Sequence, residues 1–178
     1  MPARISRNCG RPDWPALPPA KAADMPTHTE RRVVPYAPEQ LFDLVADIER
    51  YPEFLPWCRG ARIRERQSHL IVADLIIGFK MFRERFTSRV ELTPPRQIDV
   101  TYAEGPFRYL YNHWIFERVP EGCQVDFFVD FEFKSRLMQK VIEMLFGEAV
   151  RRMVSAFERR ARDLYGGHKQ ESADTAAV

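Results

Sequence analysis

The stretch from Ser135 to Tyr165 constrains the fold of this chain more than any other. Apolar residues recur along it at the spacing of one helix face. They are Met138, Ile142, Leu145, Ala149, Met153, Phe157 and Leu164. Ser135 is a residue type that caps helix N-termini, and Gly166-Gly167 supplies a stop. A helix of about 30 residues is about 45 Å long, so something wide must cover its apolar side.

Strand-like segments fill most of the chain before this helix. Six of them alternate apolar and polar residues: 61–67, 69–79, 81–92, 97–103, 107–119 and 123–133. A first strand is expected at 28–35, followed by a helix that begins at Pro38 and a break at Tyr51-Pro52. The order predicts an α+β fold in which a curved antiparallel sheet of about seven strands closes on the long helix, with two short helices after the first strand.

The two ends of the chain lie outside this pattern. Residues 1–27 are rich in Pro, Ala and Arg and lack the apolar centre of a secretory signal. We expect a disordered leader there, or a start codon assigned upstream of a true start at Met25. Residues 28–166 are expected to form one domain, and the polar tail 167–178 to be disordered.

Composition and motifs argue against several classes of function. The net charge of +2 does not indicate binding of DNA by the molecule as a whole. The three cysteines are far apart, and no zinc, nucleotide or Ser-hydrolase motif occurs. No run of 18 apolar residues indicates a membrane span. We therefore expect no metal and no catalytic cofactor, and a reducing, cytoplasmic location.

The inward face of the predicted sheet carries the strongest functional signal. Its aromatic residues are Phe79, Phe86, Trp114, Phe116, Phe127 and Phe131. A packed core explains most of this pattern. However, Glu84 and Asn112 share that apolar face, and a buried polar group without a partner costs about 1–3 kcal/mol. Either a β-bulge shifts the register, or both side chains face a ligand-sized cavity. Gly147 indicates either close approach of the helix to the sheet or a bend over a cavity mouth.

Arginines form a second pattern. By alternation, Arg62, Arg64 and Arg66 point to the same side as Arg83, Arg85 and Arg89, and the helix adds Arg151, Arg152, Arg159, Arg160 and Arg162. A solvated face with ion pairs explains the pattern, since Glu148 to Arg152 and Glu158 to Arg162 have favourable i,i+4 spacing. The alternative partners are anionic lipid headgroups or ribosomal RNA.

Several motifs carry a family resemblance. They are Tyr51-Pro52-Glu53-Phe54-Leu55-Pro56-Trp57-Cys58, Gly105-Pro106-Phe107, Asn112-His113-Trp114-Ile115-Phe116, Phe131-Glu132-Phe133-Lys134-Ser135 and Leu137-Met138. These motifs resemble the bacterial coenzyme Q-binding, START-like proteins, which are related to mitochondrial ubiquinone-binding Coq proteins, to the ribosome-association toxin RatA and to polyketide cyclase-like proteins. The resemblance covers about Thr29 to Tyr165 and implies the helix-grip fold. It also implies a hydrophobic tunnel for ubiquinone or another polyprenyl lipid, in support of respiratory electron transfer and quinone biosynthesis.

The first hypothesis is therefore a non-catalytic protein that carries ubiquinone as a bound ligand. The residues expected to contact the lipid tail are Phe79, Phe86, Trp114, Phe116, Phe127, Phe131, Leu145 and Met153. Glu84 or Asn112 would bind the polar head by a hydrogen bond. Phe54, Leu55 and Trp57 would form a mouth that dips into the membrane surface, on the inner face of the inner membrane.

Two other hypotheses stay open. The resemblance to RatA implies an interaction with the large ribosomal subunit that inhibits subunit association, and the arginines on the sheet would provide the contact. An aromatase or cyclase would need an acid or a base in the cavity, for which Glu84 or Tyr102 comes forward. Fold analogy alone supports this enzyme hypothesis.

Overall fold

The computed structural model describes residues 27–79 and 82–166, without the side chains of Phe79 and Phe82. The strands are β1 (Thr27–Val34), β2 (Cys58–Arg66), β3 (Leu70–Phe79), β4 (Phe82–Thr93), β5 (Gln97–Glu104), β6 (Phe107–Val119) and β7 (Gly122–Phe133). The helices are α1 (Pro38–Ala46), η1 (Ile48–Arg50), α2 (Tyr51–Phe54) and α3 (Arg136–Tyr165). The predicted order of elements is confirmed. The predicted leader and tail fall almost wholly outside the described residues.

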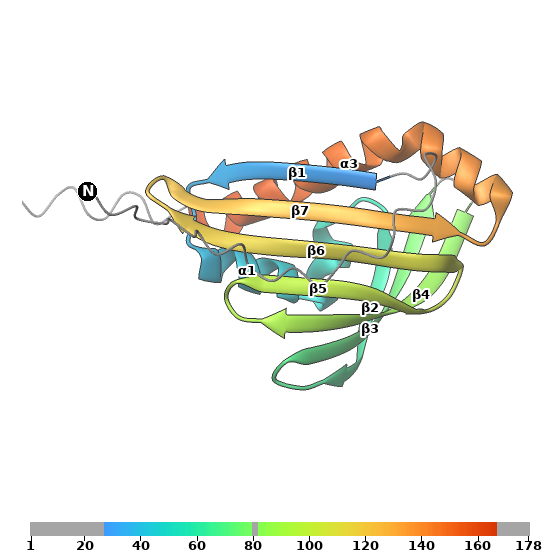
Figure 1. Ribbon diagram of the computed structural model, residues 1–178, viewed down its shortest axis with the longest axis horizontal. Helices are drawn as coiled ribbons and strands as arrows, with labels where there is room; N and C mark the ends of the chain where they lie inside the picture. The colour runs from blue at the N-terminus through green and yellow to red at the C-terminus, as the bar shows by residue number, and fades with distance from the viewer. Residues whose placement is uncertain (1–26, 80–81, 167–178) are drawn as a thin grey trace, which may run out of the picture.

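The strands form one seven-stranded antiparallel sheet in the order β1-β7-β6-β5-β4-β3-β2. Strands β2 to β7 form a meander, each pairing with the next, while β1 pairs with β7, the last strand. The sheet is curved, and α3 lies along it on the side that also carries α1 (Figure 1). This is the predicted α+β arrangement of a curved sheet on a long helix.

Helix α3 begins where the sequence predicts. The Ser135 side chain accepts a hydrogen bond from the backbone N–H of Met138 at 3.4 Å, which confirms Ser135 as the N-cap. The buried residues of α3 all lie from its midpoint onward, namely Val150, Ala156, Phe157 and Ala161. Before Val150 the helix packs on the sheet only through half-buried side chains, among them Met138, Ile142 and Phe146.

Two clusters of buried side chains make up the core. The larger cluster joins α1 and the second half of α3 to the middle of the sheet, and Leu41, Val45, Phe116 and Phe157 belong to it. The smaller cluster is aromatic and consists of Phe86, Phe107, Phe131 and Phe133. The ring centroids of Phe86 and Phe107 are 5.3 Å apart in an edge-to-face arrangement. Each end of the domain is thus held by its own packed cluster.

Among the helices that the structure describes, none is long and apolar enough to cross a membrane. Within residues 27–79 and 82–166, no three His, Cys, Asp or Glu side chains gather in a way that would hold a metal ion. Cys58 and Cys123 are both buried free thiols.

Candidate ligand-binding cavity

A cavity of about 300 Å³ lies between the sheet and α3. Helix α3 lines it with Met138, Val141, Ile142, Phe146, Ala149, Val150, Met153 and Phe157. The volume is at the lower end of the usual range for small-molecule sites. The apolar row of α3 therefore packs solidly at one end and lines a hollow at the other.

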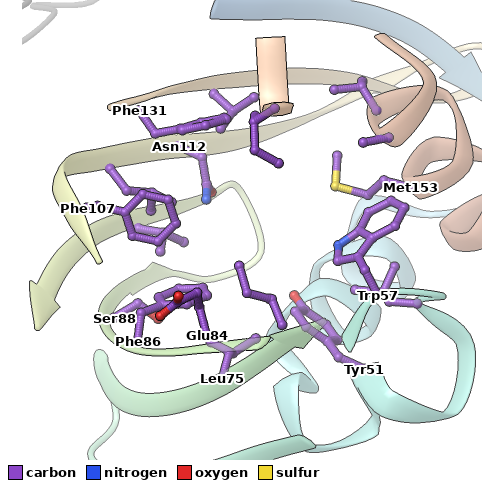
Figure 2. Close-up of a pocket in the computed structure, with 18 of the residues that line it drawn as sticks. Tyr51, Trp57, Leu75, Glu84, Phe86, Ser88, Phe107, Asn112, Phe131 and Met153 are labelled. Atoms are coloured by element: carbon purple, nitrogen blue, oxygen red, sulfur yellow. The ribbon is translucent and has the colours of Figure 1, made fainter. Parts of the chain in front are cut away.

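Most of the predicted site residues come together at this cavity. Those that line it are Leu55, Trp57, Glu84, Phe86, Asn112, Trp114, Phe127, Phe131 and Met153. Glu84 and Phe86 lie on β4, and Asn112 lies on β6, while Trp57 and Met153 face them from the other side (Figure 2). The structure thus places polar and apolar side chains from distant segments around one space.

Three predicted residues lie elsewhere, and one is not described. Phe116 is buried beside a second cavity of about 80 Å³. Leu145 is half-buried and does not reach the larger cavity, because Val141 and Phe146 form that part of the wall. The side chain of Phe79 lies outside the described part of the chain.

The third displaced residue is Phe54, which was expected at an exposed mouth. Its ring packs on Phe157 at 5.2 Å, and the guanidinium of Arg160 lies 5.7 Å from its centroid. Leu55 is only 7% exposed. The predicted membrane-dipping mouth is wrong for these two residues, because α2 turns its apolar side toward α3 and not toward solvent.

Sequence reasoning also missed residues of the cavity wall, including Tyr51, Ser88, Phe107 and Leu110. Strand alternation could have found Ser88, which shares the face of Glu84 on β4. Phe107 was not predictable in this way, since a register shift between Phe107 and Tyr109 brings it to the inner face.

The polar residues Glu84 and Asn112 both line the cavity. Glu84 pairs in register with Ile77, and Asn112 pairs with Val100 and Val129, without a bulge at either residue. Oδ1 of Asn112 is buried and has no hydrogen-bond partner in the part of the chain that the structure describes. The sequence left two explanations for these polar residues, a β-bulge or a cavity. The structure supports the cavity.

Tyr51 adds a satisfied polar group to the wall. Its hydroxyl donates a hydrogen bond to the backbone carbonyl of Val45 at 2.6 Å. Burial raises the pKa of Tyr51 above its ordinary value, so the phenol stays neutral. The hydrogen bond of Tyr51 therefore links α2 to α1, and its hydroxyl has a structural role.

The outer face of the sheet carries a charged cluster around Asp74 on β3, next to the edge strand β2. Asp74 is 5% exposed and accepts hydrogen bonds from Thr87 at 2.7 Å, from Arg64 at 2.8 Å and from Arg85. Burial by itself would raise the pKa of Asp74, but these three bonds outweigh it and lower the pKa to about 2.

The predicted arginine pattern holds only in part. A β-bulge between Ile63 and Glu65 reverses the alternation of β2, and Arg66 instead pairs with Glu49 at 3.2 Å. The prediction that Arg62, Arg64 and Arg66 share one face is therefore wrong for Arg66.

On α3, the prediction for Glu148 is confirmed, since Arg152 lies 2.7 Å from it. The prediction for Glu158 is wrong: its carboxylate pairs at 2.6 Å with Arg32 of β1 and not with Arg162. The neighbouring strand edge thus supplies a partner that spacing along the helix cannot reveal.

Gly147 does not mark a close approach of α3 to the sheet. It is exposed, and a Cβ atom added there would meet only the end of the Arg151 side chain, at 3.7 Å. The predicted close approach is wrong.

Comparison with known proteins gives relatives of two named kinds. The ribosome association toxin RatA of Pseudomonas aeruginosa is 38% identical over 144 residues, which cover 80% of this chain and 100% of that protein. A mitochondrial coenzyme Q-binding protein of Xenopus laevis is 34% identical over 156 residues, which cover 85% of this chain and 63% of that protein.

A solved structure and a family model agree with these relatives. The solution structure of an 18 kDa protein from Caulobacter crescentus has a TM-score of 0.67 at 35% identity, and the match covers 80% of this chain and 99% of that one. Residues 34–158 match the family model described as polyketide cyclase / dehydrase and lipid transport. The chain therefore belongs to the polyketide cyclase / dehydrase and lipid transport family, as a START-like protein related to RatA and to the coenzyme Q-binding proteins.

Proposed function

We propose that this protein binds ubiquinone or a similar polyprenyl lipid in the cavity between the sheet and α3, without catalysing a reaction. In this role it supports respiratory electron transfer and quinone biosynthesis. It acts in the cytoplasm, with peripheral contact to the inner face of the inner membrane.

The cavity itself is the observation that carries this proposal. Its wall is almost entirely apolar, with Glu84, Ser88, Asn112 and the edges of Tyr51 and Trp57 as its polar groups. Burial of apolar surface contributes about 25 cal/mol per Å², so a lipid tail needs no catalytic group to bind. The relative that is named for coenzyme Q binding supports a quinone as the ligand.

The two tryptophans on the cavity wall provide the test. Trp57 and Trp114 both line the cavity, so a bound quinone should quench their fluorescence. We expect saturable quenching on titration with a ubiquinone that has a short isoprenoid tail. Ala149→Phe fills the cavity from α3 and should abolish saturation, whereas Gly147→Ala, on the exposed side of the same helix, should leave it unchanged. Equal, unsaturable quenching in all three proteins would rule out binding in this cavity.

A second candidate function is an interaction with the large ribosomal subunit, as the named RatA relatives suggest. The outer face of β4 favours it, because Arg83, Arg85 and Arg89 are all exposed there. Arg85 is also a partner of Asp74, so its replacement would disturb the fold. Arg83 and Arg89 are therefore the better positions to test.

The test is co-sedimentation with ribosomal subunits. If this candidate is right, the double variant Arg83→Glu, Arg89→Glu should lose co-sedimentation, and rising salt should weaken binding of the unmodified protein steeply. Quinone titration of the same variant should stay unchanged. Co-sedimentation that survives both the variant and high salt would argue against this surface.

The enzyme hypothesis has less support. Tyr102 does not line the cavity, and its hydroxyl donates to the carbonyl of Gly105 at 2.5 Å. Glu84 then remains as the one acid or base that the sequence put forward. A ligand-binding role needs no acid or base catalyst. The proposal therefore assigns no catalytic residue, and Glu84 is considered only as a ligand-binding group.

A further inference from the structure

Glu84 occupies an unusual position for a carboxylate. It lies on the inner face of β4 together with Phe86 and Ser88, and it is half-buried in the cavity wall. Figure 2 shows Glu84 next to Phe86 on the cavity wall. An ionised group in such apolar surroundings is costly unless it gains a partner.

Within residues 27–79 and 82–166, no hydrogen bond or ion pair reaches this carboxylate. The neighbouring Arg83 and Arg85 lie on the other face of the strand, where Arg85 pairs with Asp74. Asp74 is a useful comparison, since its carboxylate is also buried and has three donors. Among the described residues, Asp74 therefore has hydrogen-bond donors, whereas Glu84 has none and faces the cavity.

The chemistry of a carboxylate limits what can satisfy Glu84. A carboxylate only accepts hydrogen bonds, and the carbonyl and ether oxygens of a quinone also only accept them. A quinol or a phenol carries an aromatic hydroxyl, which can donate a short, charge-assisted bond to a carboxylate. We propose that Glu84 binds an aromatic hydroxyl of the ligand, so that the cavity prefers a quinol or phenol head to the corresponding quinone.

Asn112 completes the recognition of the head without setting this preference. Its side-chain amide carries two N–H donors on Nδ2 and an acceptor, Oδ1, and this Oδ1 has no partner among the described residues. The Nδ2 donors can bind a carbonyl or a hydroxyl oxygen equally well, so the discrimination falls on Glu84. The inference rests on the proposed function and narrows its ligand class.

The test is isothermal titration calorimetry under anaerobic conditions. The probes are a ubiquinone with a two-unit isoprenoid tail, the quinol made from it, and a phenol with the same tail. We expect the quinol and the phenol to bind about tenfold or more tightly than the quinone. Glu84→Gln adds an amide donor at the same place and should bring the affinities of quinol and quinone within about twofold of each other.

A control variant on the same strand separates this effect from a general loss of charge. Glu91→Gln removes an exposed carboxylate that pairs with Arg89 at 3.1 Å, and it should keep the preference for the quinol. Binding of the phenol without the quinol would identify phenols as the preferred source of the hydroxyl. Equal affinity for quinone and quinol in the unmodified protein would overturn the inference and leave the proposed function intact. A failure of all three probes to bind would contradict the proposed function itself.

Discussion

Asp74 and Glu84 are two carboxylates of one β-hairpin that have different surroundings and different roles. Asp74 faces outward and is held by Thr87, Arg64 and Arg85, whereas Glu84 faces the cavity. Strand alternation assigns each of them to the correct face. The outward-facing Asp74, next to arginines, contributes to stability. The inward-facing Glu84 has no partner among the described residues and is available to a ligand.

The lowered pKa of Asp74 predicts how stability depends on pH. Its folded pKa of about 2 lies below the ordinary value of about 3.9. The group therefore contributes stability above pH 4 that is lost as the pH falls from about 4 to about 2. Because Arg64 and Arg85 are 41% and 59% exposed, solvent screens the pairs, and we expect a contribution on the order of 1–2 kcal/mol.

Urea denaturation at pH 7, 4 and 2.5 checks this prediction. Asp74→Asn should be less stable than the unmodified protein at pH 7, and the difference should shrink toward pH 2.5. Glu91→Gln, which breaks an exposed pair, should change stability little at any pH. A constant difference across the pH range would show that the charge of Asp74 is not what stabilises the fold.

Other residues could not be assigned from the sequence. Phe107 reaches the cavity and Arg66 leaves the outer face for the same physical reason, a local shift of strand register. A shift of one residue exchanges the two faces of a strand. The alternation of apolar and polar residues does not reveal such shifts. Predictions of which face a side chain occupies therefore fail for residues beyond a bulge.

At the scale of the element, α3 has two halves with different roles. Its extent and its N-cap were predictable from spacing and residue type, because both depend on local sequence. Which half packs and which half lines a cavity was not predictable, since that depends on how far the curved sheet stands from the helix. Val150 is the first buried residue along α3, and the cavity lies mainly before it.

Gly147 provides a test of this picture of α3. The residue is exposed and helical, and a Cβ atom there has room. Gly147→Ala should therefore stabilise the protein by about 0.5–1 kcal/mol, because alanine loses less backbone entropy in a helix. A urea titration at pH 7 measures the change. Destabilisation by this substitution would mean that the helix needs a glycine for a bend or a close contact.

At the scale of the whole molecule, the fold separates an apolar interior space from a charged outer face. The order of strands and helices was predictable, because each element has a clear period and the turns between them are marked. The cavity itself was predictable only as one of two explanations for Glu84 and Asn112. The partners of the outer arginines, such as Glu49 for Arg66, depend on tertiary contacts that no local pattern records.

The central claim is that the cavity holds a polyprenyl lipid with a quinol, quinone or phenol head. Organic extraction of protein purified from its native host, followed by mass spectrometry, tests this claim most directly. The account predicts a polyprenyl quinol, quinone or phenol in the extract of the unmodified protein and its loss from Ala149→Phe. An extract that contains no isoprenoid compound, or one that contains it equally in both proteins, would contradict the account.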